Sequence, residues 1–149
     1  MRRTYHIISN PAAGKTKSGK SLQIVQDVCT ESGAAFETRL TERAGDATEI
    51  ARRLTENGET EIIALGGDGT LHEVLNGLAD PSACNFGLIP SGTGNDFAEK
   101  IGLPLDADAT ARIVLKGEVK ETDYLEVGGM RCMNVAGVGM DVDVLERCK

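Results

Sequence analysis

The sequence predicts an α/β domain built on a mostly parallel sheet, and three observations support this prediction. Short apolar runs alternate with segments whose apolar residues recur at helical spacing, and strands joined by helices run parallel with right-handed crossovers. The chain has 149 residues, the size of one domain, so it can bury a sufficient core without disulfides. It also has 18 glycines, whereas average usage gives about 10, and several follow the predicted strands.

The first three elements are a strand, a helix and a strand. Thr4–Ser9 is a short run that Asn10-Pro11 interrupts, as expected of a strand that ends in a turn. Ser18–Ser32 places four apolar residues on one helical face, and Gly33 follows as a C′ residue. These residues are Leu22, Val25, Val28 and Cys29. Phe36–Leu40 is the second predicted strand.

The next helix begins at Asp46, because Asp46 followed by Glu49 resembles a capping box. Its apolar residues are Ile50, Ala51 and Leu54. Gly58 is expected to end this helix. The third predicted strand, over residues 61–65, follows.

Two further capping patterns open the later helices. Thr70 with Glu73 precedes a helix whose apolar stripe is Leu71, Val74, Leu75 and Leu78. A fourth strand over residues 86–89 follows, then a helix entrance at Asp96 with Glu99. The last predicted helix covers residues 106–116.

The last thirty residues break this alternation. Asp123–Val127 and Arg131–Val135 are predicted as two strands joined by Gly128-Gly129, a strong hairpin signal. We therefore predict an α/β domain over residues 1–120, and over 121–149 the first strands of a β-rich second domain whose remainder is missing. Because a two-stranded ribbon alone is marginal and leaves unpaired edges, we expect this hairpin to pair with a second copy, as a homodimer, or to be poorly ordered.

Composition excludes several classes of protein. The chain carries 16 Lys+Arg against 23 Asp+Glu, with two tyrosines, three phenylalanines and no tryptophan. A net charge of -7 argues against nucleic-acid binding, which needs cationic and stacking side chains. No apolar run reaches the ~18 to 20 residues of a transmembrane helix, and the start does not fit a signal peptide. We expect a cytoplasmic protein whose four scattered cysteines are reduced thiols.

Three glycine-bearing segments follow predicted strands: Asn10–Lys15, Gly66–Thr70 and Pro90–Ala98. In an open parallel sheet, ligands bind beyond the carboxyl ends of the strands, where loops lead into helix N-termini. Glycine lets backbone amides approach an anion closely, and the helix dipole favours negative charge. Phosphate is therefore the predicted ligand.

Each segment also has a plainer interpretation. Asp68 could serve as an Asx-turn residue, and Asp96 is explained as a helix N-cap by its spacing to Glu99. Residues 14–21 fit the Walker A expression, but the strand before them ends early, and Ile62–Leu65 runs into a double glycine instead of ending in an Asp. We interpret that match as a coincidence. The glycine pairs at 67 and 69 and at 92 and 94 do not complete a dinucleotide fingerprint.

Taken in order, these segments resemble the diacylglycerol kinase catalytic domain family, the bacterial soluble lipid kinases that are themselves similar to sphingosine and ceramide kinases. The matching segments are Asn10-Pro-x-x-Gly14, Thr41 with Gly45-Asp-Ala47, Gly66-Gly-Asp-Gly-Thr70 and Pro90-x-Gly-Thr-x-Asn-Asp-Phe97. The resemblance implies a Rossmann-like domain of the NAD kinase and phosphofructokinase type, a β-sandwich second domain, and ATP in the cleft between them.

The same resemblance implies which residues bind the cofactors. It places ATP against Asn10, Gly14, Lys15, Thr41, Gly66, Gly67, Asp68, Gly69, Thr70 and Thr93. It implies that Asp68 is catalytic and organises Mg²⁺, with Asp96 as its second metal residue. Phosphoryl transfer depends on charge neutralisation and positioning, so amide-rich loops, a lysine and carboxylate-held magnesium are the expected parts.

Two departures from the family pattern stand out. His72 occupies a position where relatives usually carry Asn, and we assign it no role. The general base and structural metal site implied by the resemblance belong to the second domain, of which residues 134–143 match only the entrance.

The resulting hypothesis is the ATP-binding part of a lipid kinase, inactive by itself, that phosphorylates diacylglycerol or a similar lipid at a membrane surface and contacts the inner membrane face peripherally. The alternatives are a kinase of a soluble hydroxyl substrate such as NAD, and a nucleotide-binding module without catalysis.

Overall fold

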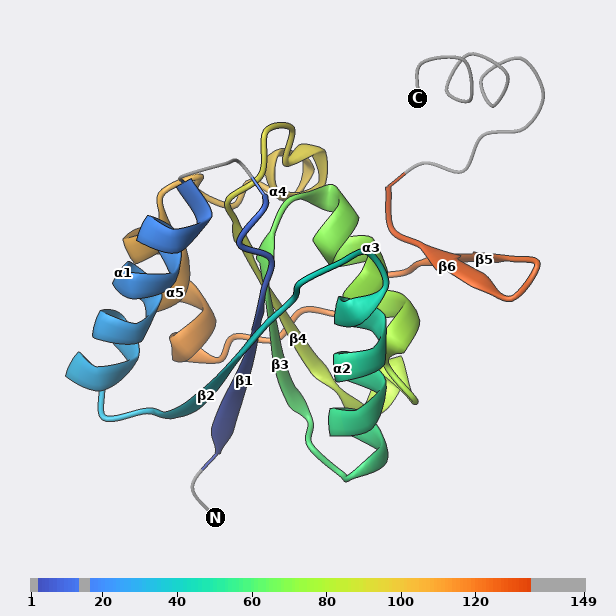
Figure 1. The fold of residues 1–149 in the computed structure, drawn as a ribbon, viewed down its shortest axis with the longest axis horizontal. Coiled ribbons are helices and arrows are strands. Elements are labelled where there is room, and N and C mark those ends of the chain that lie inside the picture. The colour runs from blue at the N-terminus through green and yellow to red at the C-terminus, as the bar shows by residue number, and fades with distance from the viewer. Residues whose placement is uncertain (1–2, 14–16, 135–149) are drawn as a thin grey trace.

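The fold is an open parallel sheet between two layers of helices (Figure 1). The computed structural model describes residues 3–13 and 17–134. Its four-stranded sheet has the order β2-β1-β3-β4, and every neighbouring pair is parallel. The strands are β1 (Thr4–Ser9), β2 (Ala35–Leu40), β3 (Glu61–Gly66) and β4 (Asn85–Pro90). The predicted α/β class and all four predicted strands are therefore confirmed.

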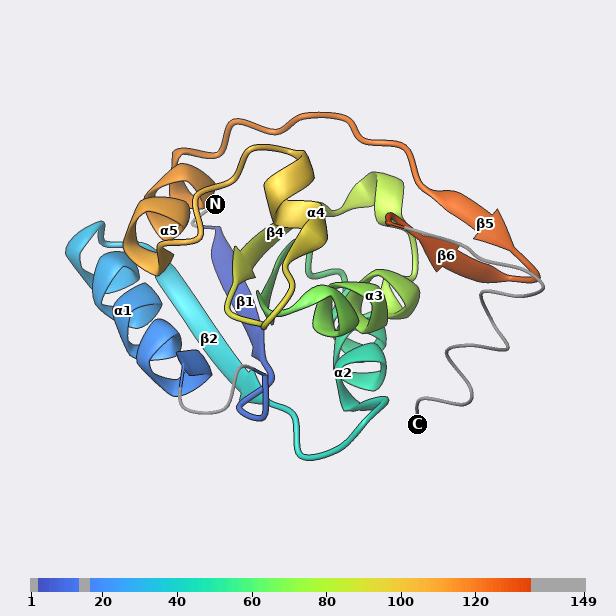
Figure 2. The same cartoon turned by 90° about the horizontal axis from the view of Figure 1, so that it is seen from above.

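The helices divide between the two faces of the sheet, as Figure 2 shows from above. On one face lie α1 (Lys17–Glu31) and α5 (Ala107–Lys116), and on the other lie α2 (Asp46–Glu56) and α3 (Asp68–Gly77). The chain moves outward from β1 to β2 and then back across β1 to β3 and β4. Crossovers between parallel strands are right-handed, so a helix that connects strands in one direction along the sheet and a helix that connects them in the other direction lie on opposite faces. The strand order alone therefore puts α1 on the other face from α2 and α3.

Both faces of the strands are buried. Alternate residues of β1 and β3, such as Ile7 and Leu65, pack under α1 and α5, while Ile8 and Ala64 pack under α2 and α3. All four side chains are completely shielded from solvent. Two-sided burial explains why the strands appear in the sequence as continuous apolar runs instead of alternating ones.

The starts of three helices differ from the capping patterns. Glycine, not a side-chain cap, stands at the N-cap of α2 and α3, so the predicted caps at Asp46 and Thr70 are wrong. Asp46 is the first residue of α2, and Thr70 lies inside α3. The short helix α4 (Asp96–Lys100) also has no side-chain bond from its N-cap, Asn95. Helix ends were predicted better, because Gly33 and Gly58 have the positive φ of terminating residues.

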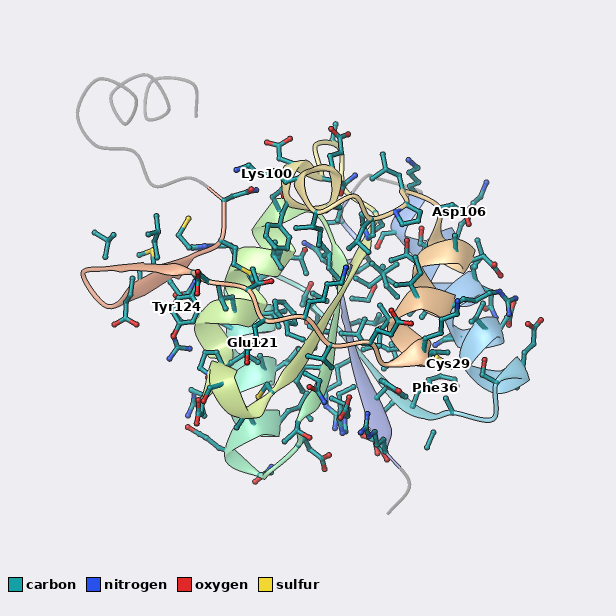
Figure 3. The ribbon with its side chains drawn as sticks, turned by 180° about the vertical axis from the view of Figure 1, so that it is seen from behind. Cys29, Phe36, Lys100, Asp106, Glu121 and Tyr124 are labelled. Atoms are coloured by element: carbon teal, nitrogen blue, oxygen red, sulfur yellow. The ribbon has the colours of Figure 1, made fainter. Side chains whose placement is uncertain are left out.

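The chain then leaves the α/β layers. After α5 it crosses the outer side of β4 (Figure 3, with Glu121 and Tyr124 labelled) and forms the hairpin of β5 (Leu125–Val127) and β6 (Met130–Cys132). Val127 pairs with Met130, and both glycines of the two-residue turn have positive φ, so the predicted turn is confirmed. Val135 lies outside the described residues.

In the described part of the chain, Cys29 is a buried thiol and Cys84 a half-buried one. No helix in that part of the chain has both the length and the apolar character needed to cross a bilayer. A turn of 3-10 helix, η1 (Pro81–Ala83), completes the elements.

Gly77 allows α2 and α3 to pack closely. A Cβ there would overlap the carbonyl oxygen of Thr48 and lie 2.8 Å from Cβ of Ala51. Gly77→Ala should lower the free energy of unfolding by about 1–3 kcal/mol, the usual cost of overpacking. Gly19→Ala is the matched control, because a Cβ on this residue of α1 meets nothing within 4 Å. It should raise stability by up to about 1 kcal/mol. Urea unfolding of both variants tests this, and equal stabilities would contradict it.

Candidate functional site

The loops after β1 and β3 leave the sheet at the point where the strand order reverses. The connection from β1 leads to β2 on one side, and the connection from β3 leads to β4 on the other. Loops that diverge in this way leave a crevice beyond the carboxyl ends of the strands, which is where open α/β sheets bind ligands. Asn10 and Gly67, both predicted nucleotide residues, lie in these two loops, and Gly69 lies in the first turn of α3 directly after the second loop.

Backbone hydrogen bonds continue the sheet beyond the strands and hold the loops together. The amide of Asn10 donates to the carbonyl of Leu65 at 3.2 Å, and the amide of Ser91 donates to that of Gly66 at 2.9 Å. The amide of Thr41 donates to the carbonyl of Ser9 at 3.0 Å. The structure therefore brings together the segments that begin at Asn10, Thr41, Gly66 and Ser91, as the sequence predicts.

Two of the glycine loops pack back to back. A Cβ on Gly67 would stand 3.1 Å from Cα of Gly92, and a Cβ on Gly92 would overlap Gly67. A Cβ on Gly66 would overlap the side chain of Thr70. Packing thus requires all three glycines, Gly67 and Gly92 between the two loops and Gly66 beside Thr70 in its own segment, a reason that the phosphate interpretation did not include. Gly69 is different, because it is exposed and a Cβ there would meet nothing within 4 Å.

Asp68 joins the second of these loops to the third. Its Oδ2 accepts the amide of Asp96 at 2.9 Å, and its Oδ1 accepts the amide of Phe97 at 3.1 Å. These are the first two amides of α4, which have no partner within that helix. Asp68 therefore caps α4 from a distance of 28 residues, and both its Asx-turn interpretation and the predicted cap at Asp96 are wrong.

A third donor reaches Asp68 from the far end of the described chain. Nδ2 of Asn134 donates to Oδ1 at 3.0 Å. A carboxylate has about four acceptor positions, so three hydrogen bonds leave about one. The carboxylate is consequently held in one orientation, with little capacity for additional ligands.

Asp96 faces the same opening. A Cβ on Gly94 would lie 3.3 Å from Oδ2 of Asp68 and 3.6 Å from Oδ1 of Asp96, so both carboxylates border the space beside Gly94. Asp96, Gly94 and Thr93 are all exposed. In the described part of the chain there is no cluster of three His, Cys, Asp or Glu that could hold a metal ion. An ion at this position would need further ligands from a bound molecule or water.

The remaining predicted site residues divide by exposure. Thr41 and Thr70 are buried, so their side chains point into the protein rather than to its surface. Asn10 shapes its own loop, because its Oδ1 accepts the amide of Ala12 at 2.9 Å. Its carbonyl accepts the Ser18 hydroxyl at 2.7 Å. Gly14 and Lys15 lie outside the described residues.

Sequence reasoning did not assign roles to Asn95 and Asn134. Asn95 has a positive φ of 62°, and its side chain bonds both the amide and the carbonyl of Gly92, at 3.0 and 2.9 Å. Asparagine tolerates this conformation and bonds nearby backbone, so its place after Gly94 was a usable signal. Asn134 gave no such signal, because its partner is 66 residues away.

A small pocket of about 190 Å³ opens beside Asp68. Its walls come from one side of α3 and from the residues at and after the end of β6: Leu71, His72, Leu75, Cys132, Met133 and Asn134. His72, which received no role from the sequence, is exposed at this pocket.

The loop before α2 is held by two carboxylates. Asp46 accepts the amides of Glu42 and Arg43 at 2.9 and 3.0 Å. Glu73 of α3 accepts the amide of Gly45 at 3.0 Å. These bonds fix the segment that follows Thr41 against the neighbouring helix.

Known proteins are similar to this chain in sequence and in fold. The profile of the diacylglycerol kinase catalytic domain matches residues 4–127. A diacylglycerol kinase of Staphylococcus saprophyticus is 36% identical over 140 residues, which cover 93% of this chain and 46% of the relative. A diacylglycerol kinase of Bacillus subtilis is 39% identical over 135 residues, or 89% of this chain and 45% of the relative.

Solved structures agree with the sequence comparison. A crystal structure of a diacylglycerol kinase from Bacillus anthracis superposes with a TM-score of 0.75 at 29% identity, covering 87% of this chain and 45% of that one. The chain thus spans about half the length of the relatives that it matches.

The bonds to Asp46 predict a pH dependence of stability. Hydrogen bonds from the backbone, that of Glu42 first, lower the pKa of Asp46 below its usual value. A lowered folded-state pKa stabilises the fold above about pH 4 and loses that contribution as the pH falls through the folded-state pKa. Asp46→Asn should therefore lower the melting temperature at neutral pH and much less near pH 3. Glu118→Gln, at an exposed position, is the control; an equal loss at both pH values would contradict the prediction.

Proposed function

The chain belongs to the diacylglycerol kinase catalytic domain family, and from this membership we propose that its α/β domain binds ATP in the crevice above β1 and β3. We further propose that the protein transfers the γ-phosphoryl group to the hydroxyl of diacylglycerol or a similar lipid. The observation that carries the proposal is the carboxylate of Asp68, which accepts three hydrogen bonds, two from the first amides of α4 and one from Asn134.

The nucleotide phosphates are assigned to the N-terminal end of α3. The first amides of a helix have no helical partner, and the helix dipole adds favourable charge toward an anion. Gly69 lies in the first turn of α3 with open space in place of a side chain. An anion can therefore approach the amides of this turn without a steric barrier.

The donor set at Gly94 fits Mg²⁺ that arrives with a nucleotide. Magnesium in such sites takes one or two carboxylates and completes its shell with phosphate oxygens and water. Asp68 has about one acceptor position left, and Asp96 is exposed beside it. When bound, the ion would neutralise charge on the transferred phosphoryl group. The amides of Asp96 and Phe97 orient Asp68 for this role.

The other nucleotide residues keep distinct roles in the proposal. Gly66 and Gly67 give the loop its shape, and the buried Thr41 and Thr70 support it from inside. Thr93 is exposed at the rim. Asn10, Gly14 and Lys15 belong to the first loop, where Lys15 would approach the phosphates.

The hairpin is proposed as the start of a second domain, with residues 1–120 forming the nucleotide domain and 121–149 the beginning of the next. Since the chain spans about half of each relative, we propose that by itself it binds ATP weakly and has negligible phosphoryl-transfer activity. The proposed setting is the cytoplasmic side of a membrane surface, where the lipid acceptor is presented. A homodimer through residues 123–135 stays a prediction.

Asp68 and Asp96 should respond differently to removal of charge. Asp96→Asn removes an exposed carboxylate that caps nothing, so it should leave the melting temperature unchanged and weaken Mg²⁺-dependent ATP binding by about 10-fold, or 1.4 kcal/mol. Asp68→Asn replaces one carboxylate oxygen by an NH2 group, which cannot accept a hydrogen bond from the backbone amides of α4. It should therefore weaken Mg²⁺-ATP binding and also lower the free energy of unfolding by about 1–2 kcal/mol, the cost of a lost helix cap.

Isothermal titration with Mg²⁺-ATP and thermal unfolding of the same samples measure both effects. Lys20→Ala, at an exposed position on α1, is the control, because a P-loop mechanism requires this lysine and the proposed site does not. Unchanged affinity in Asp96→Asn together with lost affinity in Lys20→Ala would overturn the proposed site. Phosphorylation of diacylglycerol in vesicles by the protein, with NAD as the competing acceptor, tests the substrate.

A further inference from the structure

The side chain of Asn76 in α3 forms the pair of hydrogen bonds with β6 that a neighbouring strand would form. Nδ2 of Asn76 donates to the carbonyl of Arg131 at 2.8 Å, and the amide of Arg131 donates to Oδ1 of Asn76 at 2.8 Å. The amide of one side chain thus pairs with both backbone groups of the residue. These groups lie on the edge of β6 that faces away from β5, the edge that was expected to pair with another copy of the chain or to remain disordered.

Arg131 strengthens the same attachment. Its Nη1 donates to the carbonyls of Leu75 and Leu78 at 3.2 and 2.6 Å. Carbonyls at the end of a helix have no helical partner, and the dipole there favours a cation. The guanidinium also lies over the ring of Tyr124, 5.9 Å from its centroid. We call the side chains of Asn76 and Arg131 the α3 clamp.

The clamp is linked to Asp68 by a short stretch of chain. From Arg131 to Asn134 the backbone can extend by at most about 10 Å. Along α3, Asn76 and Asp68 are eight residues apart, which corresponds to about 12 Å. The chain therefore runs back along the helix, bends at residues 133 and 134, and reaches the carboxylate through the Asn134 side chain.

Between its two ends this stretch borders a pocket. The pocket of about 190 Å³ lies between α3 and Cys132, Met133 and Asn134. Within this stretch Met133 packs against the apolar core that includes Leu71 and Leu75 of α3. Hydrogen bonds at the clamp and at Asp68 hold its two ends.

We propose that Asn76 and Arg131 are positioning residues that set the orientation of the Asp68 carboxylate through Asn134. The clamp fixes the start of this short stretch, and Asn134 then donates to Oδ1, the same oxygen that accepts the amide of Phe97. Oδ2 is thereby turned toward Gly94 and Asp96. The structural part of this inference stands on the hydrogen bonds, and its consequence for Mg²⁺-ATP rests on the proposed function.

The structural part is tested without nucleotide, by NMR of the 149-residue chain. Asn76→Ala should remove the hydrogen-exchange protection of the Arg131 amide and shift the side-chain amide resonances of Asn134 to the values of a free asparagine. Asn57→Ala, at an exposed position in α2's C-cap, should change neither. Arg131→Lys keeps the backbone pair with Asn76 and a cation for the helix end, so it should retain most of the Asn134 shift. Unchanged Asn134 resonances in folded Asn76→Ala would overturn the proposal.

The functional part is tested by a double-mutant cycle on Mg²⁺-ATP affinity. Asn134→Ala and Asn76→Ala should each weaken binding by about 10-fold, as for other residues that orient a metal ligand. Because both act through one hydrogen bond to Asp68, the double variant should bind no more weakly than Asn134→Ala alone. A loss of affinity in the double variant equal to the product of the two single losses would contradict positioning through Asn134. Absent Mg²⁺-ATP binding by the parent chain, together with the expected NMR result, would refute the proposed function and leave the clamp intact.

Discussion

The arrangement of the site depends on one carboxylate that serves two loops. Asp68 begins α3, yet its hydrogen-bond partners are the first amides of α4 and the side chain of Asn134. A group that caps another helix cannot move without disturbing that helix, so the loops after β3 and β4 behave as one unit. The same carboxylate borders the opening at Gly94, where a metal ion with its nucleotide fits. The Asp68 carboxylate thus contributes both to the stability of the fold and to the proposed chemistry.

Close approach of backbones makes this arrangement possible. Gly67 and Gly92 touch across the two loops, and Gly66 leaves room for Thr70. A side chain at Gly67 or Gly92 would separate the loops and move Asp68 away from α4. The glycines of the Gly66–Thr70 segment therefore have two separate uses: Gly66 and Gly67 allow close packing, and Gly69 leaves the helix terminus open to an anion.

The hairpin connects the α/β layers to the proposed second domain. It has little apolar packing of its own, since Leu125 and Val127 are each 60% exposed. Asn76 and Arg131 hold it by polar bonds to one helix instead. Because these bonds lie at one end of α3 and Asp68 lies at the other, the helix links the entrance of that domain to the candidate site.

Local patterns in the sequence determined the strands, the helices and their order, because apolar periodicity and terminating glycines such as Gly33 act over a few residues. The resemblance of the motifs to a known family likewise predicted that Asp68, Asp96 and the glycine loops lie at one site. The cap patterns at Asp46, Thr70 and Asp96 failed, since short spacing says nothing about partners that a crossover brings close. The capping of α4 by Asp68, the packing of Gly67 on Gly92 and the reach of Asn134 depend on contacts across 25 to 66 residues. Only the folded chain decides such contacts, because the sheet must assemble before their atoms meet.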